Sequence, residues 1–195
     1  LLEALSRKIV DALELHLTSA ERARLTHAAA DPRVVECFLR ARTHVLRFTE
    51  DGIHEGIGVA RRGLEAYGEQ PLLLGVIGDA FVRLANVAMA DQNVLLVQAR
   101  HYAQRLAELE PDSGRAHYLI GFVNLVEGDV QGSVRSLKLA LAREPQDPDV
   151  LFWLIEAYGI SGHPQLARPL AARLAMVDPL TPAHCTLGGW VELTD

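Results

Sequence analysis

The chain lacks the features that mark several large classes of protein. Only 6% of its 195 residues are aromatic, and its formal net charge of −6 leaves no basic excess for nucleic acid or an anionic membrane surface. The most apolar segment, residues 72–90, contains Asp79 and Arg83, and charges are costly inside a bilayer. The sequence therefore predicts neither a membrane span nor a nucleic-acid partner.

Cysteine is also scarce, with Cys37 and Cys185 far apart in the chain. We expect no disulfide between them, which favours a reducing compartment and a cytoplasmic location. The N-terminus has no basic segment followed by an apolar core and a cleavage site, so it does not read as a secretory signal. The chain begins at Leu1 without a methionine, and we interpret it as a segment of a longer protein.

What the chain does contain is apolar residues at helical spacing, with 49% of all residues hydrophobic and no sustained strand alternation. Three prolines, Pro111, Pro145 and Pro179, follow one another at intervals of 34 residues. A period of 34 is typical of repeats built from two antiparallel helices and two turns. In this regular part we expect helices at about 114–127, 130–143, 148–160 and 164–176.

Small residues recur at matching positions when each unit is numbered so that its closing proline is position 32. Gly121 then lies at position 8, where paired helices approach closely, and Gly128 and Gly162 lie in the turn at position 15. Positions 20 and 27 of three units hold compact or aliphatic residues: Ala99, Ser133, Ala167, Leu106, Ala140 and Leu174. This pattern resembles the tetratricopeptide repeat (TPR). An array of helical hairpins without a common groove is the alternative.

The resemblance implies an all-α fold, a right-handed superhelical α-solenoid of TPR-like antiparallel helix pairs. We expect N-terminal helices in 1–30, from an upstream domain, and a repeat domain over 31–195. Its predicted pairs are 32–68, 71–110, 111–145 and 146–179, with a partial pair in 180–195. The chain departs from the pattern at three positions. Ile155 replaces a small residue, Asn124 replaces an aromatic residue, and Pro169 lies inside a helix that it should interrupt.

A second resemblance concerns the protein around this segment. The runs at 5–13, 17–25 and 35–42, with the string LTSAERARL in the middle one, resemble a junction in bacterial multidomain signalling proteins. In those proteins a TolB-like segment, linked to an adenylate cyclase, kinase or winged-helix regulator, leads into TPR units. The resemblance implies that this chain is the repeat region of such a protein.

Residues with catalytic or metal-binding chemistry form no known constellation. The eight histidines make no HExxH or Cys/His set, and no cysteine or serine has a base at nucleophile spacing. The glycines of 56–63 lack the spacing and the preceding strand of a phosphate loop, so we interpret them as helix-packing positions. We therefore expect no cofactor, no metal and no catalysis by this chain. A small-molecule sensor or enzyme using Asp79, Arg83 and His101 is the least favoured interpretation.

The resemblance implies a partner-binding groove along the first helix of each pair, where positions 2, 5, 9, 12 and 13 face the concave side. The corresponding residues that we assign to the groove are Arg115, Tyr118, Phe122, Leu125, Val126, Phe152, Glu156, Ile160 and, in the partial last unit, Trp190. The Lys and Asn residues that clamp a peptide carboxylate in some members are absent.

An apolar, aromatic groove suits a peptide or an amphipathic helix from a protein partner or from the same chain. The sequence thus predicts a non-catalytic interaction scaffold. Two alternatives stay open: missing helices or an upstream domain cover the same residues, or an uncapped end of the array makes a homodimer.

Overall fold

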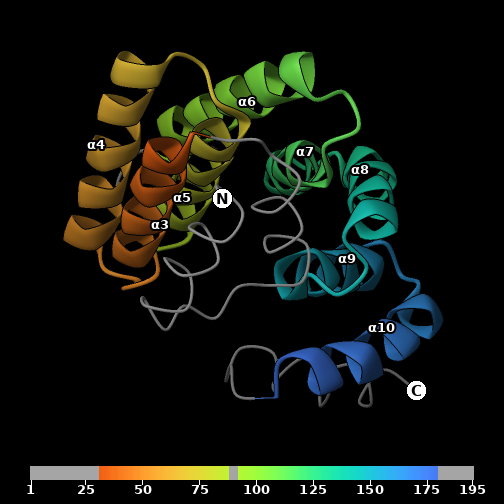
Figure 1. The fold of residues 1–195 in the computed structure, drawn as a ribbon. Coiled ribbons are helices and arrows are strands. Elements are labelled where there is room, and N and C mark those ends of the chain that lie inside the picture. The colour runs from red at the N-terminus through yellow and green to blue at the C-terminus, as the bar shows by residue number, and fades with distance from the viewer. Residues whose placement is uncertain (1–30, 88–91, 180–195) are drawn as a thin grey trace. The chain divides into compact units, whose positions relative to one another are not determined.

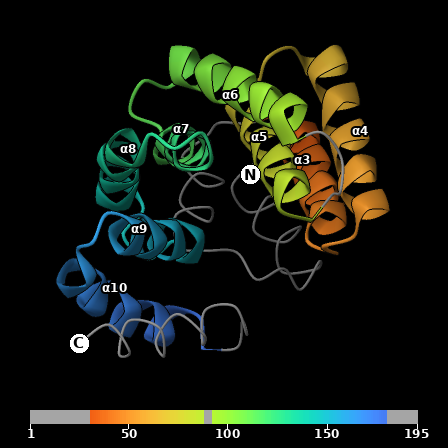
Figure 2. The ribbon, with the colours of Figure 1, turned by 180° about the vertical axis from the view of Figure 1, so that it is seen from behind.

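The computed structural model describes residues 31–87 and 92–179 (Figures 1 and 2). All regular structure in these two ranges is α-helical, which agrees with the predicted all-α fold. The helices are α3 (Pro32–Val45), α4 (Glu50–Tyr67), α5 (Pro71–Val87), α6 (Gln92–Leu109), α7 (Gly114–Val126), α8 (Val130–Arg143), α9 (Pro148–Ile160) and α10 (Pro164–Val177).

The contacts within the chain divide it into an N-terminal unit, Leu1–Pro111, and a C-terminal unit, Asp112–Asp195. The sequence predicted a single repeat domain over 31–195 and did not predict this division after Pro111. The helices expected in 1–30 and the partial last pair in 180–195, including Trp190, lie outside the described residues.

Side-chain caps explain where several helices begin. Asp31 accepts a hydrogen bond from the Arg33 amide at 3.0 Å, and Pro32 follows it at the first helical position. Asp129 and Asp147 cap α8 and α9 by accepting hydrogen bonds from amides three residues later. Each cap satisfies a backbone donor that the first turn of a helix leaves without a partner.

Within the N-terminal unit, α4 packs on α3 and on α5, and α5 packs on α6. Glycines make the first of these contacts close. A β-carbon added at Gly56 would lie 2.7 Å from the Ala41 carbonyl oxygen, and one added at Gly63 would lie 2.5 Å from the Cys37 sulfur. Gly56 and Gly63 are therefore helix-packing positions, as the sequence predicted, whereas a β-carbon at Gly58 would meet only the end of Arg62 at 3.5 Å.

Within the C-terminal unit, α7 pairs with α8 and α9 with α10, and α8 and α9 are also neighbours (Figure 1). A β-carbon at Gly121 would lie 2.7 Å from the Leu137 side chain, which confirms the close approach predicted at this position. Gly128 and Gly162 have φ of 89° and 74° in the turns between paired helices, a conformation that favours glycine. Ser133 and Ala167 are fully buried between the paired helices.

Pro169 does not end α10, which continues from Pro164 to Val177. The proline lies on the exposed side of the helix, where the carbonyl left without its usual amide donor can be hydrated. Among the described residues, no helix combines the length and the apolar character needed to cross a membrane.

Candidate partner-binding site

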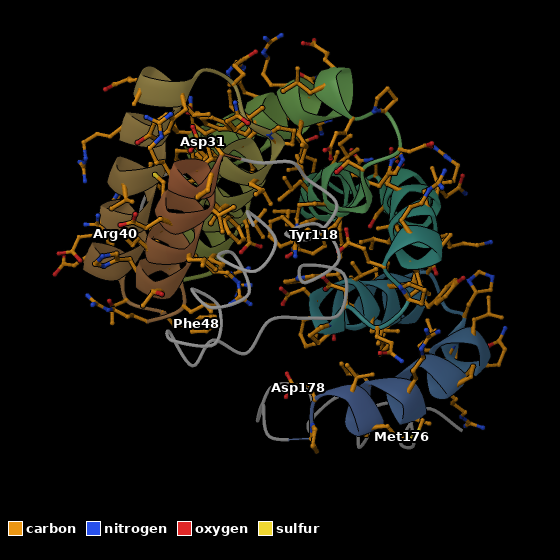
Figure 3. All side chains as sticks on the ribbon, viewed as in Figure 1. Asp31, Arg40, Phe48, Tyr118, Met176 and Asp178 are labelled. Atoms are coloured by element: carbon orange, nitrogen blue, oxygen red, sulfur yellow. The ribbon has the colours of Figure 1, made fainter. Side chains whose placement is uncertain are left out.

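Three of the nine residues assigned to the groove are buried. Tyr118 is 2% exposed, Phe122 is 0% exposed, and Leu125 is also classed with the core (Figure 3 labels Tyr118 on α7). The expectation that these side chains form an open groove floor is therefore wrong. The physical reason is that buried residues cover more than half of the circumference of α7 and leave only a narrow face, with His117, Ile120 and Asn124, that is partly exposed.

Phe122 packs against an aromatic residue that the repeat positions did not single out. Its ring meets the ring of Trp153 edge-to-face, with centroids 4.8 Å apart and an interplanar angle of 77°. Trp153 in turn meets Phe152 edge-to-face at 5.0 Å. Phe122 thus holds the aromatic residues of α9 in place. The adjacent aromatics at 152 and 153 were the signal in the sequence that pointed to this cluster.

Arg115 lies in a buried ion pair. Its guanidinium donates to the Asp147 carboxylate, with Nη2 and Oδ2 3.2 Å apart, and the two side chains are 11% and 1% exposed. The guanidinium also lies 5.0 Å from the centroid of the Tyr118 ring. Asp147 caps α9 at the same time, so one carboxylate ties the start of α9 to α7. Arg115 was assigned to partner binding, and the structure places it at the junction between two helix pairs.

Burial raises the pKa of Asp147 to about 7. Arg115 and the hydrogen bond from the Val150 amide oppose this shift, whereas the nearby carboxylates of Asp149 and Glu144 reinforce it. Glu144 is itself buried beside Gly114, where an added β-carbon would lie 2.7 Å from its Oε1. The junction therefore holds several acids around one arginine in a site largely closed to water.

Three of the predicted groove residues are not fully buried and lie four residues apart on α9, where Phe152 also packs against the core between α9 and α10. We refer to Phe152, Glu156 and Ile160 as the α9 stripe. Phe152 and Glu156 are half-buried, and Ile160 is 60% exposed. Residues at this spacing share one face of a helix, so the stripe presents one carboxylate between two apolar side chains. Val126, at the end of α7, is half-buried.

Comparison with solved structures places this geometry in a known fold. The crystal structure of TTC0263, a thermophilic TPR protein of Thermus thermophilus, aligns with a TM-score of 0.70 at 18% identity, covering 98% of this chain and 99% of that one. The fold is TPR-like. MamA (TM-score 0.53, 17% identity, 74% of this chain and 79% of that one) is also similar. So is YrrB, described as a TPR protein with an unusual peptide-binding site (TM-score 0.52, 17% identity, 92% and 84% covered).

Sequence comparison is less extensive. No family model matches the chain. A segment of 108 residues is 32% identical to the probable biofilm formation methyltransferase WspC of Pseudomonas putida. This similarity covers 55% of the chain and 23% of the length of WspC, so the chain spans less than a quarter of this relative.

The residues considered for a sensor or an enzyme do not form a reactive arrangement. Arg83 donates to Asp79 at 2.8 Å one turn away on α5, and its guanidinium lies over the Phe48 ring. His101 packs edge-to-face on Tyr102. In the described ranges, no group of three or more His, Cys, Asp or Glu residues is placed to hold a metal ion. The α9 stripe is thus the strongest candidate for a functional site in the TPR-like fold.

Proposed function

We propose that this chain is a non-catalytic protein-interaction scaffold that binds a peptide or an amphipathic helix on the α9 stripe. The observation that carries the proposal is the exposure of Ile160 in line with Phe152, on a first helix of a TPR-like pair. Apolar side chains that stay accessible beside an ordered aromatic cluster suit a partner's apolar residues. The peptide-binding site named for YrrB supports the same kind of partner.

The proposed setting is the cytoplasmic, regulatory part of a larger bacterial signalling protein. The similarity to one segment of WspC supports a place within a longer chain, because the match covers 23% of that protein. Methyl transfer, or any other catalysis, would then belong to a different region of the full-length protein. The junction-like runs near the N-terminus, with LTSAERARL in 17–25, point to the same setting.

A display library of short helical peptides, selected on the immobilised 195-residue chain, tests the scaffold proposal. Ile160→Glu places a charge on the stripe at an exposed position, so it should leave the melting temperature nearly unchanged. We expect peptides selected on the natural chain to bind Ile160→Glu at least about tenfold more weakly, since an apolar contact is replaced by a desolvated charge. A Leu139→Glu variant, exposed on α8, is the matched control.

Peptides that bind Ile160→Glu and the natural chain equally well would show that the α9 stripe is not the binding surface. A library that yields no specific binder for the natural chain would contradict the scaffold proposal itself.

Homodimerisation is the second candidate function. Leu166 and Met176 are both exposed on α10, and Met176 is 78% exposed (Figure 3). Exposed large apolar residues on the last described helix suit contact with a second copy. Sedimentation at micromolar concentration should then show a dimer that Met176→Glu dissociates, and a strictly monomeric natural chain would rule this candidate out.

A further inference from the structure

Glu156 is a half-buried carboxylate that makes no hydrogen bond or ion pair with another residue of the described chain. Burial raises its pKa above the ordinary value, and no neighbouring charge in the described ranges offsets this effect. The last turn of α9 also contains no basic residue. Asp147, at the start of α9, differs because it pairs with Arg115. Glu156 therefore bears a desolvation penalty for which the described part of the chain supplies no compensation.

The residues around Glu156 indicate which partner group would compensate the desolvation of its carboxylate. Phe152 and Ile160 flank it one turn before and one turn after, and the three span about 12 Å along α9 at 1.5 Å per residue. Phe152 is held by Trp153, whose ring is in turn packed on the buried Phe122. A fixed apolar surface therefore carries one negative charge at its centre. A partner that removes more water from this carboxylate must supply a hydrogen-bond donor with the apolar contact, and a cation compensates the charge best.

We propose that the α9 stripe binds an amphipathic helix that places a single lysine or arginine between two apolar residues. This inference rests on the scaffold function proposed above and names the chemistry of its partner. A helix is the expected form because side chains spaced four residues apart on a partner helix match the rise between Phe152, Glu156 and Ile160. The acidic net charge of −6 also favours a cationic partner.

Peptide selection and substitutions that change the charge of Glu156 test this inference on the 195-residue chain. Peptides from the helical display library are selected in parallel on the natural chain and on Glu156→Gln, and the apolar faces of the enriched sequences are compared. We expect lysine or arginine at the centre of the apolar face only in the first pool. For one such peptide, Glu156→Gln should weaken binding about 10- to 100-fold, the value of a hydrogen bond between charged groups.

The same peptide with norleucine in place of the central cation should bind Glu156→Gln at least as well as it binds the natural chain. Glu156→Lys should reject the cationic peptide and accept a version with a central glutamate. Glu110→Gln removes an exposed carboxylate elsewhere and is the charge control. The melting temperature of Glu156→Gln should not fall, because the amide removes a half-buried charge.

The outcomes separate the two proposals. If the selected peptides depend on Ile160 but show no excess of central cations, the scaffold function stands and the cationic partner is wrong. Equal binding to Glu156→Gln and the natural chain contradicts the cationic partner in the same way. If the peptides do not depend on Ile160, or if no peptide is enriched, both proposals fail together.

Discussion

Nη2 of Arg115, on α7, lies 3.2 Å from Oδ2 of Asp147, the residue that caps α9. This buried ion pair links two consecutive helix pairs of the C-terminal unit. Breaking such a pair from one side leaves a buried charge without a counter-charge. The pair therefore fixes the start of α9, the helix that carries the α9 stripe, against α7.

Replacing Arg115 with methionine should lower the free energy of unfolding by about 3 kcal/mol at pH 8, because Asp147 must then either stay ionised without a counter-charge or take up a proton from solution. The loss should be smaller at pH 5, where Asp147 can bind a proton. Urea unfolding of Arg115→Met, Asp147→Asn and the double variant measures the coupling. Single effects that add to within about 0.5 kcal/mol would show that the two side chains do not interact.

The raised pKa of Asp147 predicts how stability depends on pH. Burial raises it from 3.8 to about 7, so between these values the folded chain holds a proton that the unfolded chain releases. The contribution of Asp147 to stability is therefore fully present below about pH 4 and declines as the pH rises through about 7. Melting temperatures of the natural chain and Asp147→Asn across this range check the prediction. A slope that is equal in both proteins would contradict it.

Two glycines of α4, two residues apart, predict opposite effects of the same substitution. Gly56→Ala should destabilise the fold by about 1–3 kcal/mol, because the new β-carbon would meet the backbone carbonyl of Ala41 at 2.7 Å. Gly58→Ala should stabilise it by about 0.5–1 kcal/mol, since its nearest neighbour is the flexible end of Arg62 at 3.5 Å. Denaturant midpoints of the two variants and the natural chain measure these changes in stability. A stabilising Gly56→Ala would contradict the close packing of α3 and α4.

Phe122→Ala should reduce the free energy of unfolding by about 3–5 kcal/mol, as is typical of a fully buried aromatic residue. Ile160→Ala, at a 60% exposed position assigned to the same groove by the repeat spacing, should change it by less than about 0.5 kcal/mol. Chemical unfolding of both variants distinguishes core from surface. If Phe122→Ala left the free energy of unfolding nearly unchanged, Phe122 would not be a core residue.

The repeat spacing predicted the local structure well where small residues must lie at fixed places. Gly121, Gly128 and Gly162 lie at a helix contact and in two turns, as their positions required. Such residues are informative because only glycine readily tolerates positive φ or the absence of space for a β-carbon. The helices predicted for 114–176 agree with α7 to α10 to within about one residue at each end.

The candidate site was predictable only in part. The repeat spacing placed Phe152, Glu156 and Ile160 on one helix, but the TPR resemblance assigned Tyr118 and Phe122 to the same groove, and these two are buried. A repeat position predicts which way a residue points within its own helix pair. It does not predict whether neighbouring helices bury that residue. The available signal that this helix is core was that apolar residues cover most of the circumference of α7.

The sequence by itself determined the helical repeat, the turns and the lack of a basic excess, because these depend on local backbone geometry and composition. Only the tertiary structure decided which groove positions are core, that Arg115 pairs with Asp147, and that Glu156 has no partner among the described residues. Burial and ion pairing depend on residues that are distant in the chain. A period of 34 residues cannot specify them, since it describes one unit at a time.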